Sequence, residues 1–95
     1  MKLRFTQQSL RDLEEIAAYL RERNMSAVGR VRTSILEALK DIADFPHLGR
    51  LQSVDGVRKY VTRGYSYLVY YILAADSIIV LSIRHSARRR DYTDA

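Results

Sequence analysis

The spacing of apolar residues divides the first half of the chain into a short strand and two helices. Leu3 and Phe5 alternate with charged residues, which predicts a strand, and Thr6 can cap a helix that follows it. Apolar residues then recur three and four positions apart, as on one face of a helix: Leu10, Leu13, Ile16, Ala17 and Leu20. A second series follows Ser26, a candidate N-cap: Val28, Val31, Ile35, Leu39 and Ile42. Because the break is short, the two helices should run antiparallel.

The second half has the pattern of strands. Pro46 disfavours helix at the residue before it, so the second helix should end there and a loop should run to Gly56. Residues 57–63, 67–73 and 78–83 are rich in β-branched and aromatic side chains, which predicts an antiparallel meander. The expected fold class is α+β, in the order β-α-α-β-β-β. A helical hairpin should pack on a mainly antiparallel four-stranded sheet, against Ile79, Leu81 and Ile83.

Length and composition favour one small cytoplasmic domain. Ninety-five residues fit a single domain, residues 1–95. The sequence contains no cysteine, which favours a reducing compartment. Its longest apolar stretch, residues 68–75, is far shorter than a membrane span of about 20 residues. A soluble cytoplasmic protein is therefore expected.

The positive charge is unevenly distributed. The formal net charge is +5, and residues 57–95 hold seven Lys and Arg against three Asp and Glu. Arginine is suited to bidentate contacts with phosphate or carboxylate. An anionic partner and a merely solubilising surface both remain open.

Common catalytic and cofactor motifs are not found. The four glycines lack the spacing of a phosphate-binding loop, and two histidines without cysteine make no metal-ligand cluster. No cofactor or metal is therefore expected. Two groups could still carry chemistry. The first is basic: Arg58, Lys59, Arg63, Arg84, His85 and Arg88.

The second group is aromatic: Tyr60, Tyr65, Tyr67, Tyr70 and Tyr71. Aromatic side chains on a basic sheet can stack on the bases of single-stranded RNA. Tyrosine also packs well in sheets, so core packing is the alternative. For the basic group, strict alternation places Arg84 on the same face as Ser82 and Val80. His85 then follows Ile83 on the other face, where a structural role is the alternative to catalysis.

In this order the motifs resemble the RelE/ParE superfamily of bacterial type II toxins over nearly the whole chain. The matching pieces are an F-T opening at residues 5–6, L-E-E-I at residues 13–16, F-P-H-L-G-R at residues 45–50, and the strands at residues 57–58, 67–71 and 78–85. The resemblance implies an acidic antitoxin partner, with which the toxin forms a hetero-oligomer.

Two activities occur in this superfamily. RelE-like members cut messenger RNA on the ribosome without a metal, and one arginine of theirs falls on Tyr67 here. ParE-like members inhibit DNA gyrase by binding it and end their last strand in H-x-x-R, as at residues 85–88. The sequence therefore resembles the ParE branch more closely. A ribosome-dependent endoribonuclease and a member without toxicity are the alternatives.

The resemblance also suggests roles for particular residues. Binding to the target is expected at the basic C-terminal end and at one further arginine: Arg84, His85, Arg88, Arg89 and Arg58. A nuclease would instead rely on Arg63, Arg84, His85 and Tyr92. The antitoxin should cover the helical hairpin and part of the sheet: Leu13, Ile16, Leu20, Arg32 and Tyr67.

Overall fold

A computed structural model describes residues 1–86 and confirms the α+β class with two helices on one sheet. The elements are β1 (Lys2–Phe5), α1 (Gln7–Arg23), a 3₁₀ turn (Met25–Ala27), α2 (Val28–Asp44), β2 (Arg50–Leu51), β3 (Arg58–Val61), β4 (Tyr67–Leu73) and β5 (Ser77–His85). The sheet has five strands, one more than predicted, because the short strand β2 forms within the segment predicted as loop.

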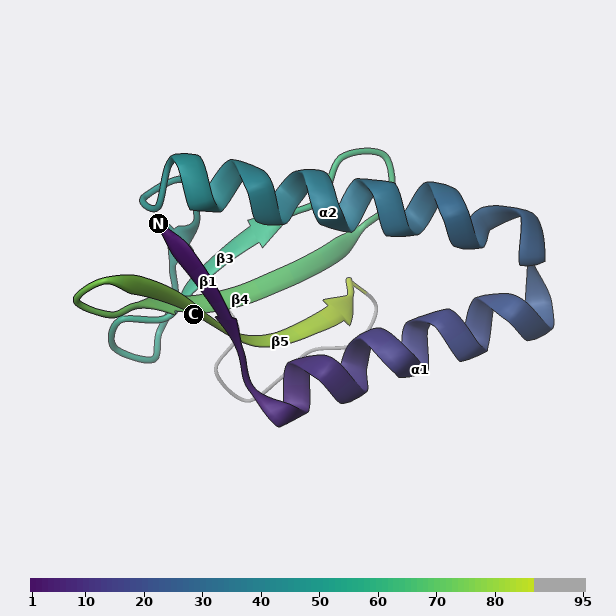
Figure 1. The fold of residues 1–95 in the computed structure, drawn as a ribbon, viewed down its shortest axis with the longest axis horizontal. Coiled ribbons are helices and arrows are strands. Elements are labelled where there is room, and N and C mark those ends of the chain that lie inside the picture. Colours follow the sequence, from purple (N-terminus) through teal and green to yellow (C-terminus); the bar gives the residue numbers. More distant parts are fainter. Residues whose placement is uncertain (87–95) are drawn as a thin grey trace.

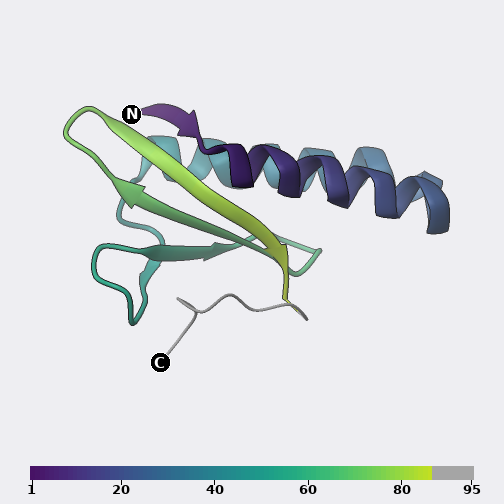
Figure 2. The ribbon, with the colours of Figure 1, turned by 90° about the horizontal axis from the view of Figure 1, so that it is seen from below.

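The strands lie in the order β1-β5-β4-β3-β2. The predicted antiparallel meander is confirmed for β3, β4 and β5, and β1 joins it by pairing parallel with β5. Both helices cover one face of the sheet and run in opposite directions (Figures 1 and 2). The other face, turned away from the helices, is called the outer face below. No helix within residues 1–86 is long and apolar enough to cross a membrane.

Helix α1 begins where it was predicted to begin. The Thr6 hydroxyl oxygen accepts a hydrogen bond from the Ser9 N–H at 3.1 Å and donates to the Leu81 carbonyl at 2.9 Å, so the helix cap also ties α1 to β5. The predicted apolar stripe is only partly correct, because Leu10 is 47% exposed. Ser9 and Asp12 are buried in its place. This end of α1 lies against strand backbone, where hydrogen-bonding side chains fit better than apolar ones.

Helix α2 buries the predicted stripe. Its apolar side chains pack in the main core between helices and sheet, and their buried members include Val31, Ile35, Leu39 and Ile42. The predicted cap at Ser26 is wrong. Ser26 lies in the 3₁₀ turn, where its hydroxyl donates to Asn24 Oδ1 at 2.8 Å, and α2 follows Ala27 without a side-chain cap.

A β-bulge in β5 changes which residues face the helices. Tyr70 pairs with Ser82 and Tyr71 pairs with Val80, so Leu81 is an extra residue in the strand. The alternation on which the prediction relied is interrupted at a bulge. Val80 therefore faces the helices, whereas Ser82 lies on the outer face.

Two predictions fail for this reason. The core contains Ile78, Val80 and Ile83, whereas Ile79 and Leu81 do not face the helices. Arg84 lies on the outer face beside Leu68, as Ser82 does, and not on the face of Val80.

The loop between α2 and β2 is fixed from within by two side chains. The Tyr71 hydroxyl accepts the Gly49 N–H and donates to the Pro46 carbonyl, both at 2.8 Å. Arg58 donates to the carbonyls of His47 and Gly49, at 3.3 and 2.7 Å. The loop is therefore held in a defined shape at the edge of the sheet.

Candidate functional site

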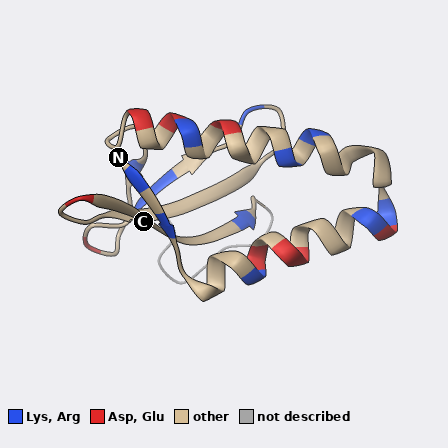
Figure 3. Cartoon of the chain, viewed as in Figure 1, with Lys and Arg blue, Asp and Glu red and all other residues tan. Residues whose placement is uncertain are grey.

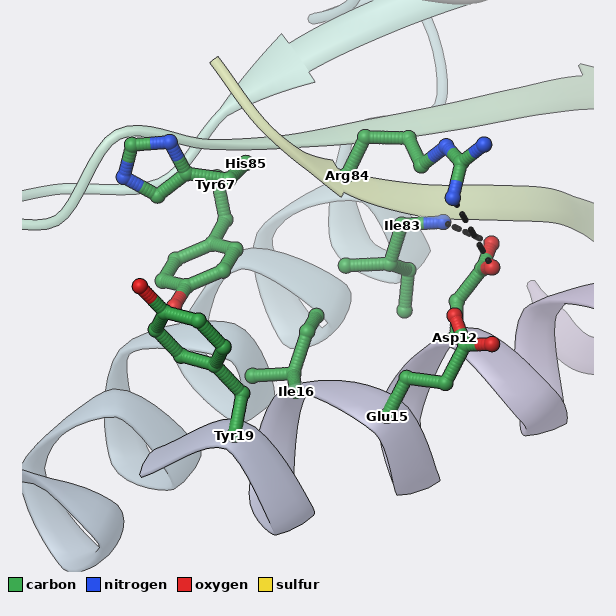
Figure 4. A pocket seen from close by; sticks show the side chains of 8 residues that line it. All are labelled: Asp12, Glu15, Ile16, Tyr19, Tyr67, Ile83, Arg84 and His85. Carbon is green, nitrogen blue, oxygen red and sulfur yellow. Dashed lines mark hydrogen bonds and ion pairs between the residues drawn. The ribbon is translucent and has the colours of Figure 1, made fainter. Parts of the chain in front are cut away.

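A cleft of about 460 Å³ lies between α1 and the ends of β4 and β5 (Figure 4). It is lined by Asp12, Glu15, Ile16, Tyr19, Tyr67, Ile83, Arg84 and His85. The cleft therefore brings four of the predicted site residues to one place: Ile16, Tyr67, Arg84 and His85. The other four were not predicted as site residues.

Asp12 connects the helix to the last strand. Its side chain is in contact with Gln8 Nε2 at 2.8 Å and accepts the Ile83 N–H at 3.0 Å. A third contact, at 3.5 Å, joins its carboxylate to the Arg84 guanidinium (Figure 4). Asp12 is only 1% exposed. A buried carboxylate needs such partners, so this contact fixes α1 against β5.

Arg84 is largely buried as well. Its side chain is 20% exposed, and its Nε atom is buried without a hydrogen-bond partner in the part of the chain that the structure describes. The guanidinium therefore serves first to neutralise Asp12. This contact limits how freely Arg84 can reach a ligand.

The opposite wall of the cleft is aromatic. The rings of Tyr67 and His85 meet edge to face, with centroids 5.2 Å apart. Tyr67 is 6% exposed, and burial raises the pKa of its phenol, with a smaller contribution from Tyr19. Tyr19 is 49% exposed, and the Arg23 guanidinium carbon lies 4.2 Å from its ring centroid. At neutral pH Tyr67 is therefore an uncharged, buried wall of the cleft.

Of the described residues predicted for a nuclease, two line the cleft, Arg84 and His85, and Arg63 does not. Arg63 lies in the turn after β3 and pairs with Asp41 of α2 at 3.7 Å, away from the cleft. Arg84 and His85 are consecutive in β5 and point to opposite faces of the sheet. Tyr92 lies outside the described residues. Within residues 1–86, the predicted cations thus form no single cluster.

The predicted target-binding residues are also divided. His85 is exposed at the end of β5, whereas Arg58 faces the helices and holds the loop after α2. Arg88 and Arg89 lie outside the described residues. Their role stays a prediction.

The residues predicted to contact an antitoxin lie partly in the core. Leu13, Ile16 and Leu20 are half-buried against the main core, and Tyr67 belongs to it. Arg32 is exposed on α2. Only the exposed parts of this set can meet a partner without rearrangement.

The tyrosines do not form the stacking platform considered from the sequence. Tyr67, Tyr70 and Tyr71 are buried, and Tyr60 and Tyr65 are half-buried. Burial raises the pKa of Tyr71 and of Tyr60, the latter also through its hydrogen bond to Asp41. These tyrosines therefore pack in the core or against it, which is the alternative to base stacking.

No group of three or more His, Cys, Asp or Glu within residues 1–86 is placed to hold a metal ion. The carboxylates of the cleft are the residues that sequence reasoning missed. Asp12 and Glu15 fall among the charged positions of an amphipathic helix, where most side chains face solvent. No local signal separates the buried carboxylate from the exposed one.

The known proteins that this chain resembles include bacterial toxins, and one family model matches nearly the whole chain. A family model described as ParE toxin of the type II toxin–antitoxin system ParDE matches residues 3–90. Toxin RelE3 of Caulobacter vibrioides is 33% identical over 84% of this chain and 88% of its own length. The protein Y4kP of Sinorhizobium fredii, which is named as a toxin, is 29% identical over 90% of this chain and 88% of its own length.

Solved structures agree on the fold. A chain of the chromosomal ParDE system of P. aeruginosa superposes with a TM-score of 0.77 at 22% identity, covering 90% of this chain and 95% of that one. At this identity the likeness concerns the fold alone. The solved chain shares the arrangement of helices and sheet, and the family match covers residues 3–90. The chain belongs to the ParE toxin family of type II toxin–antitoxin systems.

Proposed function

We propose that this toxin inhibits DNA gyrase by binding it, and that an acidic cognate antitoxin neutralises the toxin by forming a hetero-oligomer with it. In this proposal the chain is a binding protein of the cytoplasm that makes and breaks no bond. Membership in the ParE toxin family supports a toxin with an antitoxin partner. The choice of gyrase depends on the residues at the end of β5.

The observation that carries this choice is the state of Tyr67. This residue occupies the position at which the resemblance places an arginine in RNA-cutting members. Here it is a buried phenol packed against His85, with a raised pKa. It has no fixed positive charge to stabilise the charge that develops on a phosphate during cleavage.

The neighbouring cations do not replace that arginine. Arg84 is paired with the buried Asp12, and Arg63 is paired with Asp41 beside α2. A metal-free nuclease relies on electrostatic stabilisation by positioned donors. The described residues therefore support binding over RNA cleavage.

In this proposal gyrase and the antitoxin bind different surfaces. The end of β5, with His85 and the arginines that follow it in the sequence, contacts gyrase. The antitoxin covers α1 and the cleft, where Ile16 lies beside the exposed Tyr19. Both assignments stay proposals for these residues.

One observation favours a second candidate. The 33% identity to Toxin RelE3 supports a RelE-like activity, in which the toxin cuts translated messenger RNA. His85 is then the candidate for general acid–base catalysis, because it is the exposed histidine at the end of β5.

One culture can separate the two activities. After the chain is expressed without antitoxin, plasmid topology is read on chloroquine gels and messenger RNA ends are read by primer extension. Gyrase inhibition predicts growth arrest, relaxed plasmid and intact messages. Cleavage within codons with normal supercoiling would refute the proposal, and unimpaired growth would indicate a member without toxicity.

Two variants sharpen this experiment. Replacing the exposed His85 by Ala should weaken the arrest if the end of β5 contacts the target. Arg21→Ala is the matched control, because Arg21 is exposed on α1 and lines no part of the cleft. Equal loss in both variants would contradict the assignment of the target surface.

A further inference from the structure

The two layers of the fold differ sharply in charge. The five strands carry six Lys and Arg and no Asp or Glu, whereas α1 and α2 carry six Lys and Arg and seven Asp and Glu. The two remaining acids among residues 1–86 lie in turns, at Asp55 and Asp76. In Figure 3 the red segments accordingly lie on helices and turns, while the strands carry only blue. The sheet is thus strongly cationic and the helical layer is close to neutral.

Most of the strand cations point away from the helices. In the strand ladder Lys59 lies opposite Tyr70, which belongs to the apolar cluster of the outer face. Arg84 is an exception, because its guanidinium turns to Asp12 of α1. Arg50 lies opposite Lys59, so its side chain is on the same face.

Cations also project from the outer face at the opposite edge of the sheet, which is formed by β1. In β1 the side chain of Leu3 packs against the main core, so Lys2 and Arg4 project from the outer face by alternation. Lys2, Arg4 and Arg50 are exposed, and none of them has an ion-pair partner among residues 1–86. Exposed cations therefore occupy both edges of the outer face.

Apolar anchors are scarce on this face. Leu68 and Tyr70 are 7% and 0% exposed, and Ile72, Ile79 and Leu81 are at most half-exposed. Among the outward strand residues, Val61 is the most exposed large apolar side chain, at 48%. Protein interfaces usually have exposed aromatic or aliphatic anchors at their centre, so this face is better suited to a polyanion.

The geometry favours a duplex over a single strand. Four strand spacings of about 4.8 Å make the sheet about 19 Å wide, enough for its edges to reach phosphates on both sides of a groove about 12 Å wide. Single-stranded RNA is instead bound through exposed aromatic rings, and the strand tyrosines are buried or half-buried.

We infer that the outer face of the sheet binds the phosphate backbone of double-stranded DNA, through Lys2 and Arg4 at one edge and Arg50 at the other. The contact is independent of base sequence, because it involves phosphates alone. It extends the proposed function, since gyrase holds duplex DNA and the toxin would then touch both enzyme and substrate.

The test is direct binding to DNA without gyrase. A fluorescent 30-base-pair duplex is titrated with the full chain at several salt concentrations, and the anisotropy is recorded. The variant Lys2→Gln, Arg4→Gln, Arg50→Gln is compared with Arg11→Gln, Arg21→Gln, Lys40→Gln. Both lower the net charge from +5 by three, but the second set lies on the helices.

The expected result is a difference between these variants. Each lost phosphate contact reduces the slope of log affinity against log salt by about 0.9, so the strand variant should lose about 2.7 from the slope of the wild type. Its affinity at 0.1 M salt should fall at least about 30-fold. The helix variant should keep the slope and stay within about threefold of the wild-type affinity.

Four results would overturn the inference. Equal losses in both variants would indicate bulk charge only. Tighter binding to a single-stranded RNA of equal length would indicate a different nucleic acid, and displacement of the duplex by polyglutamate at equal charge concentration would indicate an acidic protein as partner. DNA binding is measured without gyrase, so gyrase inhibition by a chain that binds no DNA would refute this inference alone. DNA binding by a chain that does not inhibit gyrase would refute only the proposed function.

Discussion

Replacing Asp12 by Ala should destabilise the fold more than most single substitutions, because this carboxylate joins α1 to β5. The change removes an acceptor from the Ile83 N–H and the counter-charge from Arg84. Both groups are largely buried, at 1% exposure for Ile83 and 20% for the Arg84 side chain. Neither can replace the lost partner with bulk water unless the helix moves.

The size of the effect follows from these contacts. Removing one partner of a buried pair costs about 3–5 kcal/mol, and a hydrogen bond to a charged group contributes about 1.5–3 kcal/mol. Because Arg84 is not fully buried, a value near the lower limit, about 3 kcal/mol, is expected. Asp12→Asn keeps one carbonyl acceptor but loses the charge, so about half of this loss is expected.

Guanidinium unfolding followed by circular dichroism measures the difference. With a slope of about 2.5 kcal/mol/M, a loss of 3 kcal/mol lowers the midpoint by roughly 1.2 M. Glu15→Gln is the matched control, since Glu15 lines the same cleft but is exposed, and its effect should stay within about 0.5 kcal/mol. A cost below about 1 kcal/mol for Asp12→Ala, or one equal to the control, would refute this account of the junction.

Three further predictions concern the core and the loop. Gly49→Ala should cost about 2 kcal/mol in the same unfolding assay because the added Cβ would lie 2.5 Å from the Tyr71 hydroxyl, whereas Gly29→Ala, with open space in α2, should gain about 0.5–1 kcal/mol. Tyr71→Phe should cost about 1–3 kcal/mol, because it removes both hydrogen bonds that hold the loop, and proteolysis should then cut the loop faster. Burial raises the pKa of Tyr60, Tyr67 and Tyr71 above 10.0 in the folded state. Their contribution to the free energy of unfolding is therefore present below pH 10.0 and is lost as the pH rises above it. The denaturant midpoint of unfolding should therefore decrease as the pH is raised above 10.0, and it should decrease less steeply for Tyr67→Phe. A midpoint that does not change with pH in this range would contradict the raised pKa values.

Much of the fold was readable because its signals are local. Helix α2 carries one uninterrupted apolar stripe, and β4 was predicted with its observed bounds, residues 67–73. The Thr6 cap was likewise predictable, since it depends on a neighbour three residues away. Such features are encoded within a few turns or residues and need no knowledge of tertiary contacts.

The failures have a common physical cause, which is contact between distant segments. Asp12 is buried because it accepts from Ile83, 71 residues away, and nothing near Asp12 marks it as different from Glu15. The bulge at Leu81 depends on pairing with β4, so strict alternation misplaced its neighbours. Strand β2 is two residues long and forms only because β3 lies beside it.

In the candidate site, too, local features were predictable and contacts between distant segments were not. Strand alternation near the end of β5 correctly separates Arg84 from His85, because no bulge intervenes there. The burial of Arg84 was not predictable, since its partner comes from α1. Arg58 was expected at a binding surface, but the structure gives it loop carbonyls as partners.

Gyrase activity with purified components tests the central claim most directly. Relaxed plasmid, gyrase and ATP are combined with increasing amounts of the full chain, and supercoiled product is measured. The account predicts that supercoiling falls once the chain is in excess over gyrase and returns when the cognate antitoxin is added first. Full supercoiling at a tenfold excess of folded, antitoxin-free chain would contradict it.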